Sequence, residues 1–262
     1  SGGEECDRHI ENDYYLTESE KNLMGRICQI FENVILILNI NGVVDLKWID
    51  TYSAIKAVLF LGISGEEGCG ALADILTGRI NPSGKLGFTI AESLWDYPTA
   101  NNFTWNKENP EDILTYENYG LSAAKNGSIG YDKSPVTLYQ EDIYLGYRYF
   151  DTFQKKVLFP FGSGLSYTSF DIVPKEVIQQ DEEYEIVTEV TNTGNYAGKE
   201  TIQLYLSCQN TATERPQKEL KGFEKTKLLA PGESEEIHIY IERKELAVYV
   251  EAKASYILEK GT

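Results

Sequence analysis

GISGEEGCGALADILTGRINPSGKLGFTI, residues 62–90, is the stretch that decides the fold of this chain. It opens with closely spaced glycines, which permit positive φ and close approach of the backbone. A short apolar pattern typical of a helix follows and stops at Thr77-Gly78. Asn81–Gly84 then predicts a turn, because proline pre-sets φ for a turn position, and residues 86–90 alternate as in a strand. The stretch therefore predicts a strand end, a glycine loop, a helix, a turn and a new strand, which is the local order of an α/β domain.

The residues before this stretch predict a helix and a buried strand. Thr17 and Glu20 have the spacing of a capping box and precede an apolar stripe of helical period, so we expect a helix over residues 17–32. Residues 34–40, VILILNI, form a continuous apolar run, which is typical of a strand buried on both faces of a parallel sheet. Asn41-Gly42 closes that strand with a turn.

A second buried strand is expected at residues 57–61, after a weak helix around residues 52–56. A strand, a crossover and another strand at this spacing predict a parallel βαβ unit, and such units are almost always right-handed. The fold class of this half is therefore α/β with a mostly parallel sheet.

The sequence takes on an all-β character beyond about Phe170. Period-two runs at residues 184–190, 201–206 and 237–241 are separated by turn motifs, which predicts a β-sandwich. Residues 93–140 form instead a polar, aromatic and turn-rich segment, of a length that is usually functional or disordered. The expected parts are an α/β domain over 1–95, a long loop and connecting segment over 96–169, and a β-sandwich over 170–262.

The composition is that of an acidic globular protein. Of its 262 residues, 42% are hydrophobic, which allows a sizeable core, and the formal net charge is −17. That charge, without any cluster of Lys and Arg, argues against nucleic acids and anionic membranes as partners. No uninterrupted apolar segment reaches about 18 residues, so we expect no transmembrane helix.

The cysteines and histidines predict neither a metal site nor a disulfide framework. The four cysteines share no C-x-x-C spacing and there are only two histidines, so we expect no bound metal. A chain of this size does not depend on disulfides, which favours a reducing, cytoplasmic compartment. The first residues, SGGEECDRHI, lack the features of a signal peptide, and we expect the chain to be a fragment or excised region of a longer protein.

The acids in the loop at residues 2–8 suit glycoside hydrolysis. Such enzymes need one protonated carboxyl as the acid and one carboxylate as the nucleophile. Like charge beside Glu4 and Glu5 could raise the pKa of one carboxyl, as a general acid requires. By composition alone an acidic loop is more often solvated surface, so the residues leave both readings open.

Three other chemistries fit less well. The glycines at 62–70 lack the Gly-Lys-Ser/Thr ending of a phosphate-binding loop. Glu66 and Glu67 would also repel an anion, and their expected place is the amino terminus of a helix, where acids interact favourably with the dipole. Ser163 lies in Gly-Ser-Gly rather than in a nucleophile elbow, which disfavours a serine hydrolase. Asp181-Glu-Glu lacks the spacing of a calcium-binding loop.

A series of motifs lies in order along nearly the whole chain. They are GEECDR (3–8), GEEGCGALADILTG (65–78), NPSGKL (81–86), YQEDIYLGYRYFD (139–151), FPFGSGLSYT (159–168), NTG…AG (192–198), and RP…ELKGF with PGES (215–234). Together they resemble glycoside hydrolase family 3, the β-glucosidase and β-xylosidase family. The last two are similar to the fibronectin type III-like domain of that family.

The resemblance implies a three-part enzyme of which this chain holds an incomplete α/β sandwich and a fibronectin type III-like sandwich. The missing part is an amino-terminal (β/α)8 barrel, which in the family carries the aspartate nucleophile and most contacts to the glycone. Counting back from Asp7-Arg8 places the family's acid/base glutamate at Glu4, while Glu5 occupies a position usually held by glycine. The family has a further strand after the position of Gly261, so the sandwich is expected to lack its last strand. The resemblance implies no cofactor.

The expected function is that of the carboxy-terminal part of a retaining β-glycosidase acting on terminal β-D-glucosyl residues of glucosides or oligosaccharides. The chain alone is expected to be inactive, because the nucleophile would lie in the barrel, its expected partner. A β-xylosidase or arabinosidase of the same family and a non-catalytic carbohydrate-binding or interaction module are the alternatives, and a homo-oligomer stays open. Trp95, Tyr97 and Trp105 are expected on the aglycone side, because aromatic rings stack on pyranose faces, although an ordinary aromatic cluster fits them equally well.

Overall fold

The computed structural model describes residues 10–101, 114–119, 136, 138–209 and 212–259. Its contacts divide the chain into two compact units. The amino-terminal unit comprises residues 1–68, 90–142 and 156–158, and the carboxy-terminal unit comprises residues 69–89, 143–155 and 159–262. The domain boundaries expected near residues 95 and 170 stay predictions.

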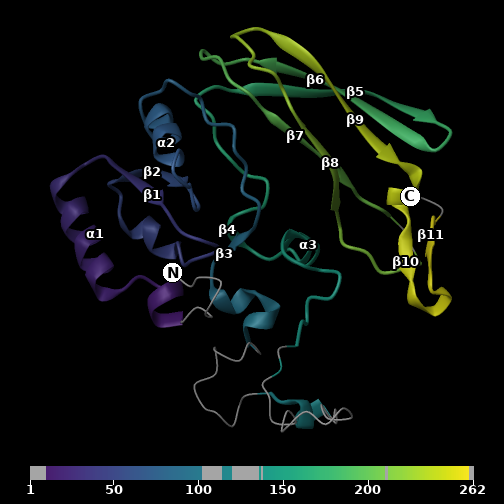
Figure 1. Cartoon of the computed structure of the whole chain (residues 1–262), viewed down its shortest axis with the longest axis horizontal. Coiled ribbons are helices and arrows are strands. Elements are labelled where there is room, and N and C mark those ends of the chain that lie inside the picture. Colours follow the sequence, from purple (N-terminus) through teal and green to yellow (C-terminus); the bar gives the residue numbers. More distant parts are fainter. Residues whose placement is uncertain (1–9, 102–113, 120–135, 137, 210–211, 260–262) are drawn as a thin grey trace. The chain divides into compact units, whose positions relative to one another are not determined.

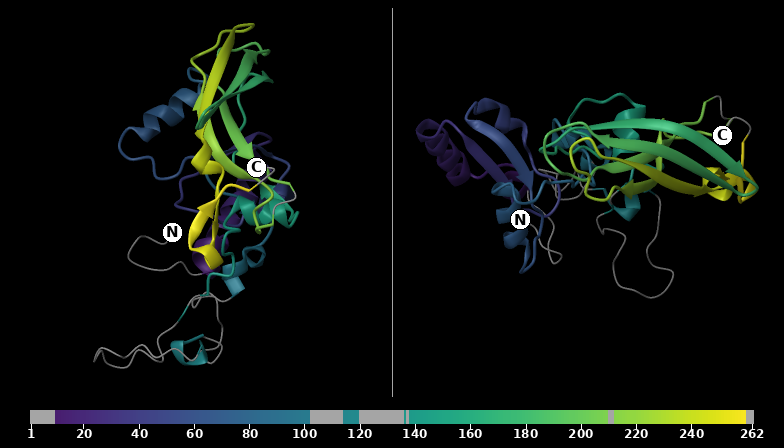
Figure 2. Two further views of the ribbon diagram at one scale, coloured as in Figure 1. Left: turned by 90° about the vertical axis from the view of Figure 1, so that its right-hand side faces the viewer. Right: turned by 90° about the horizontal axis from the view of Figure 1, so that it is seen from above.

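Helix α1 (Glu18–Ile30) begins at the capping box that the sequence predicted. The Thr17 hydroxyl accepts a hydrogen bond from the Glu20 backbone N–H at 3.3 Å, and the Glu20 carboxylate accepts one from the Thr17 N–H at 2.8 Å. Two amide groups that would otherwise lack a partner are thereby satisfied, which stabilises the helix by about 1 kcal/mol. The helix buries Met24 and lies beside strands β1 and β2 (Figure 1; Figure 2, right).

Strands β1 (Val34–Leu38) and β2 (Ile55–Phe60) pair in parallel, as predicted. The helix expected around residues 52–56 is wrong. The crossover forms instead a 3-10 helix, η2 (Lys47–Thr51), while Ile55 already pairs with β1. Ile55 and its neighbours have β-branched and apolar side chains that favour a strand over a helix.

The expectation that residues 34–40 are buried on both faces is also wrong. Ile35 is 51% exposed, and Leu38 is the one buried residue of β1. Among the described residues β1 pairs with β2 alone, so this two-stranded sheet lacks the neighbours that would cover a central strand.

Helix α2 (Gly68–Leu76) follows the glycine loop, as predicted. Glu66 and Glu67 lie exposed in the turn directly before it. The helix ends at the predicted break, where Gly78 has a φ of +72° and its N–H donates to the Ile75 carbonyl at 2.9 Å. Glycine adopts such a left-handed conformation at no steric cost.

The strand expected over residues 86–90 is wrong except at its end. Strand β3 comprises only Ile90–Ala91 and pairs with β4 (Val157–Phe159). Leu86 bonds instead to a loop, donating to the Ser163 carbonyl at 2.9 Å and accepting from the Gly162 N–H at 2.8 Å. A sequence period reports which faces are apolar but not which partner a short segment will meet.

The all-β character predicted for the last third is confirmed. Its strands are β5 (Phe170–Gln180), β6 (Glu183–Asn192), β7 (Thr201–Leu206), β8 (Glu219–Lys225), β9 (Ser234–Glu242), β10 (Val248–Val250) and β11 (Ser255–Ile257). One antiparallel sheet has the order β5-β6-β9, a second pairs β7 with β8, and a third pairs β10 with β11 (Figure 1).

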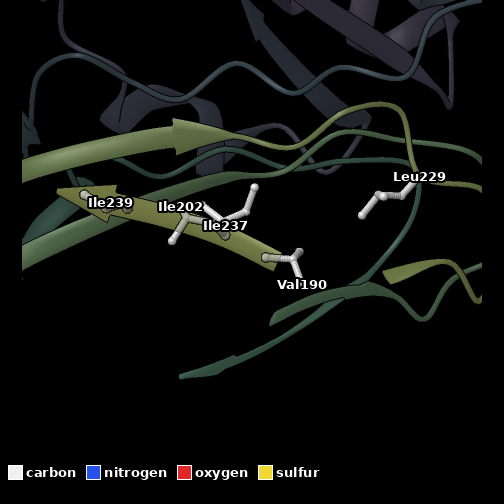
Figure 3. Packing of buried hydrophobic residues seen from close by; sticks show 5 residues of the cluster. All are labelled: Val190, Ile202, Leu229, Ile237 and Ile239. Atoms are coloured by element: carbon white, nitrogen blue, oxygen red, sulfur yellow. The ribbon is translucent and has the colours of Figure 1, made fainter. Parts of the chain in front are cut away.

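The core of the carboxy-terminal unit lies where β6, β7 and β9 come together. Its buried residues are Val190, Ile202, Leu229, Ile237 and Ile239 (Figure 3). Phe170 and Leu204 pack against this cluster. Alternation along β9, which buries Ile237, Ile239 and Ile241, is the period-two pattern from which the sandwich was predicted.

The remaining helical segments are short. They are η1 (Ile10–Tyr14), η3 (Leu94–Asp96), η4 (Pro98–Asn101), η7 (Tyr116–Tyr119), α3 (Tyr147–Thr152), η9 (Arg243–Leu246) and η10 (Glu251–Lys253). Within the described part of the chain, no helix combines the length and apolarity that a membrane span needs.

Candidate functional site

An open pocket of about 360 Å³ lies in the amino-terminal unit. Three segments line it: the residue after η1, the connection between β1 and β2, and the two residues after β3. The lining side chains are Tyr15, Asp45, Lys47, Trp48, Thr51, Glu92 and Ser93. We call this set the carboxylate–indole pocket.

The position of this pocket follows from the parallel β1–β2 pair. Strand β1 ends at Leu38, and the connection that leaves its carboxyl end carries Asp45 and η2. In open α/β sheets the loops at the carboxyl ends of the strands build the ligand sites, because helices cover the faces and leave that edge open. Four of the seven lining residues of the carboxylate–indole pocket, Asp45, Lys47, Trp48 and Thr51, come from this connection.

Backbone hydrogen bonds fix the wall formed by Asp45 and Trp48. The Asp45 N–H donates to the Tyr14 carbonyl at 3.0 Å, and its carboxylate accepts from the Lys47 N–H at 3.2 Å. The indole N–H of Trp48 donates to the Asp45 carbonyl at 3.0 Å, and its ring meets Tyr52 edge to face at 6.1 Å between centroids. The orientation of the indole is thus set before any ligand arrives.

Other polar groups of the pocket are uncommitted. Among the described residues, the Glu92 carboxylate and the Lys47 ammonium have no hydrogen-bond or ion-pair partner, and the Tyr15 hydroxyl has none either. The Ser93 hydroxyl accepts from the Trp95 N–H at 3.3 Å. The arrangement offers acceptors, a cationic donor and an aromatic ring to a ligand that carries several hydroxyl groups.

Buried Tyr14 and partly buried Tyr97 lie close to residues of the pocket, because Tyr14 precedes Tyr15 and Tyr97 bonds to Ala91, the residue before Glu92. Tyr14 is 7% exposed, and its pKa is raised by burial first and then by Tyr97 and Asp45. Burial also raises the pKa of Tyr97, although a hydrogen bond that its hydroxyl accepts from the Ala91 N–H at 3.0 Å acts in the opposite direction. Both phenols therefore stay protonated near neutral pH.

Two of the four site residues predicted from the sequence lie within the described part of the chain. Glu4 and Trp105 lie outside the described residues. Trp95 belongs to η3, is 46% exposed and follows Ser93 of the pocket by two residues, while Tyr97 is held by Ala91 as described above. A role of Trp95, Tyr97 and Trp105 in substrate binding stays a prediction.

Asp45, Trp48 and Glu92 line the pocket but were not among the residues predicted from the sequence. A signal for the first two was present, because Asn41-Gly42 closes an apolar strand and the polar residues after such a strand face the ligand edge of the sheet. Glu92 carries no comparable signal, since only the folded chain brings the segment after β3 to the same pocket. Among the described residues, no three His, Cys, Asp or Glu side chains are grouped to hold a metal ion.

Two family models match the chain. The model of the glycosyl hydrolase family 3 C-terminal domain matches residues 1–167, and that of the fibronectin type III-like domain matches residues 200–262.

Proteins similar to this chain carry the name β-glucosidase. Beta-glucosidase A of Butyrivibrio fibrisolvens is 35% identical over 271 residues, which cover 95% of this chain and 29% of that protein. A β-glucosidase of Ruminococcus albus is 36% identical over 251 residues, which cover 95% of this chain and 23% of that protein. The chain thus spans less than a third of the length of these relatives.

Solved structures of similar proteins have the same fold. Beta-glucosidase 3B from Thermotoga neapolitana, in complex with α-D-glucose, matches with a TM-score of 0.76 and 35% identity over 94% of this chain and 32% of its own. A β-glucosidase from Bifidobacterium adolescentis matches with a TM-score of 0.78 and 29% identity over 98% of this chain and 33% of its own.

Proposed function

The chain belongs to glycoside hydrolase family 3, and from this membership we propose that it is the carboxy-terminal part of a retaining β-glucosidase. The proposed reaction is hydrolysis of terminal β-D-glucosyl residues from glucosides and oligosaccharides. The observation that carries the proposal is 35–36% identity to two β-glucosidases across 95% of the chain.

Glu4 is the proposed general acid/base. In a retaining mechanism a carboxylate attacks the anomeric carbon while a carboxyl group gives its proton to the leaving oxygen. The same group then takes a proton from water as that water attacks the glycosyl-enzyme. Glu5 and Asp7 lie close to Glu4 in sequence, and their like charge supports a raised pKa for the proton donor.

The proposed nucleophile is an aspartate of a (β/α)8 barrel outside this chain. Retention requires the two carboxyl groups to lie about 5–5.5 Å apart, so neither acts alone. We therefore expect the isolated chain not to turn over an aryl β-glucoside. Turnover by the isolated chain that disappears in Glu4→Ala would contradict this division of the site.

The role of Glu4 is tested in the complete enzyme with Glu4→Ala. With a natural glucoside, kcat should fall by about 10²–10⁴-fold, since the leaving oxygen no longer receives a proton. With 2,4-dinitrophenyl β-glucoside, whose leaving group needs no proton, kcat/KM should stay within about tenfold, because the acid no longer matters in that step. Azide should then raise kcat and yield β-glucosyl azide, since it replaces the water that Glu4 would activate.

Glu5→Gln is the matched control, because it neutralises the neighbouring carboxylate of the same loop. At its own pH optimum, which should move to lower pH because a like charge beside Glu4 is removed, it should keep activity on both substrates within about tenfold of the parent enzyme and show no azide product. Equal losses in the two variants, or loss in Glu5→Gln alone, would remove Glu4 from the proposed role. A panel of aryl glucosides, xylosides and arabinosides on the same enzyme tests the glycone.

A further inference from the structure

We propose that the carboxylate–indole pocket is a sugar-binding subsite that takes a neutral pyranose, as a monosaccharide or as one ring of a short gluco-oligosaccharide. The inference rests on the proposed function for its choice of glucose as the sugar. The location, polarity and shape of the site come from the pocket itself.

The indole of Trp48 supplies the apolar part of such a site. Sugars present C–H groups on one ring face, and a flat aromatic ring buries them against its π surface. Because Trp48 already uses its N–H on the Asp45 carbonyl, its ring is held in place, and binding costs little side-chain entropy.

The uncommitted polar groups supply the specificity. Carboxylates such as Glu92 accept two hydroxyl hydrogens at once, while the Lys47 ammonium and the Tyr15 hydroxyl donate to sugar oxygens. Asp45 adds a second carboxylate whose orientation is fixed by the Lys47 N–H.

The charges of the pocket select among ligands. Two carboxylates against one ammonium disfavour an anion such as a phosphorylated sugar. The ammonium of Lys47 offsets one of the two carboxylates, so the attraction of the pocket for a cation is weak. A ligand that is neutral and rich in hydroxyl groups satisfies all three groups together.

The size of the pocket fits this choice. Its volume of about 360 Å³ lies at the lower end of the range of small-molecule sites, about 300–1,000 Å³. This volume therefore suits one or two sugar rings rather than a long polysaccharide.

The test uses the 262-residue chain, titrated with methyl β-D-glucoside, cellobiose and the open-chain polyol sorbitol. Saturation-transfer NMR and tryptophan fluorescence report binding. We expect saturable binding of both glucosides and none of sorbitol over the same range, because the polyol cannot lay a rigid ring face on Trp48.

Four variants locate the binding. Trp48→Ala and Glu92→Gln should each weaken it by at least about tenfold, which corresponds to about 1.4 kcal/mol. Trp48→Tyr keeps an aromatic face and should retain more affinity than Trp48→Ala. Glu32→Gln changes an exposed carboxylate outside the pocket and should bind as the parent chain does. Thermal unfolding of each variant shows whether it is folded, so that a loss of binding can be told apart from unfolding.

Three results would overturn the inference: no saturable binding of either glucoside, equal binding of sorbitol, or binding unchanged in Trp48→Ala and Glu92→Gln. None of them bears on hydrolysis by the complete enzyme, which depends on Glu4. Conversely, the chain could bind glucosides while the complete protein fails to hydrolyse them. That result would support the subsite and contradict the proposed function.

Discussion

The Lys85 ammonium lies 2.6 Å from the Glu200 carboxylate, and the two side chains are only 19% and 13% exposed. Lys85 lies in the irregular segment between α2 and β3, and Glu200 stands directly before β7. The same carboxylate oxygen accepts the Thr201 N–H at 2.6 Å. This ion pair joins the segment around Lys85 to the start of β7, and both residues belong to the carboxy-terminal unit.

Lys85→Met should lower the free energy of unfolding by about 1–3 kcal/mol, because it leaves a poorly solvated carboxylate without its counter-ion. Urea denaturation measures the loss. A double-mutant cycle with Glu200→Gln should give a coupling energy of at least about 0.5 kcal/mol. Arg79→Met is the control, since its ion pair with Asp74 at 3.3 Å is largely exposed and should contribute less than about 0.5 kcal/mol. If the losses of unfolding free energy in the two single variants simply add in the double variant, Lys85 and Glu200 do not stabilise the fold through their ion pair.

Gly164→Ala should destabilise the carboxy-terminal unit by about 1–3 kcal/mol. A Cβ at Gly164 would lie 2.2 Å from the Gly84 carbonyl oxygen, so one backbone segment must move. Gly84→Ala is the matched control on the other side of this contact, because its Cβ would meet nothing within 4 Å. Differential scanning calorimetry should show a clearly lower Tm for the first variant and a shift within about 2 °C for the second. Similar melting of both variants would count against the close approach.

Asn192→Ala should cost about 2–4 kcal/mol of unfolding free energy. Asn192 is fully buried, and its side-chain N–H groups donate to the carbonyls of Tyr196 and Leu229 at 2.8 and 2.9 Å, while its oxygen accepts two further bonds. Asn195→Ala, at an exposed position of the same turn, should change stability by less than about 0.5 kcal/mol. Chemical denaturation followed by circular dichroism compares the two, and equal effects would contradict the network.

Glu185→Gln should reduce the dependence of the free energy of unfolding on pH in the acid range. Hydrogen bonds from His238 at 2.7 Å and Tyr240 at 3.0 Å hold the pKa of Glu185 below its ordinary value of 4.5. A depressed carboxylate pKa gives stability that is present above the unfolded-state pKa and is lost as pH falls through the folded-state pKa.

Denaturation at a series of pH values measures this effect. The parent chain should exceed Glu185→Gln by a constant amount above about pH 5.5, and the difference should shrink as pH falls through and below 4.5. Glu236→Gln, on an exposed position of β9, is the control and should follow the parent curve. A difference independent of pH would show that the hydrogen bonds do not favour the ionised carboxylate.

Local patterns predicted the local structure correctly. The Thr17–Glu20 box starts α1, the apolar run from residue 34 makes β1, and Gly78 ends α2. Each of these signals acts within a few residues, through a capping hydrogen bond, side-chain alternation or a φ that glycine tolerates.

Predictions failed where the partner of a segment decides its structure. Ile35 is exposed because its strand has one neighbour among the described residues, which no property of the run itself reveals. Leu86 was expected in a strand but bonds to the loop at Gly162 and Ser163, because the close approach of Gly164 to Gly84 brings that loop alongside.

The sequence by itself determined the order of the elements, the all-β nature of the last third and the family motifs from which Glu4 is proposed as the acid/base. Those signals are local or linear, and a chain carries them before it folds. Only the tertiary structure decided that Asp45, Trp48 and Glu92 line one pocket, and that Lys85 meets Glu200 across more than a hundred residues. Long-range pairing is selected by burial and shape in the folded core, and those depend on every segment at once.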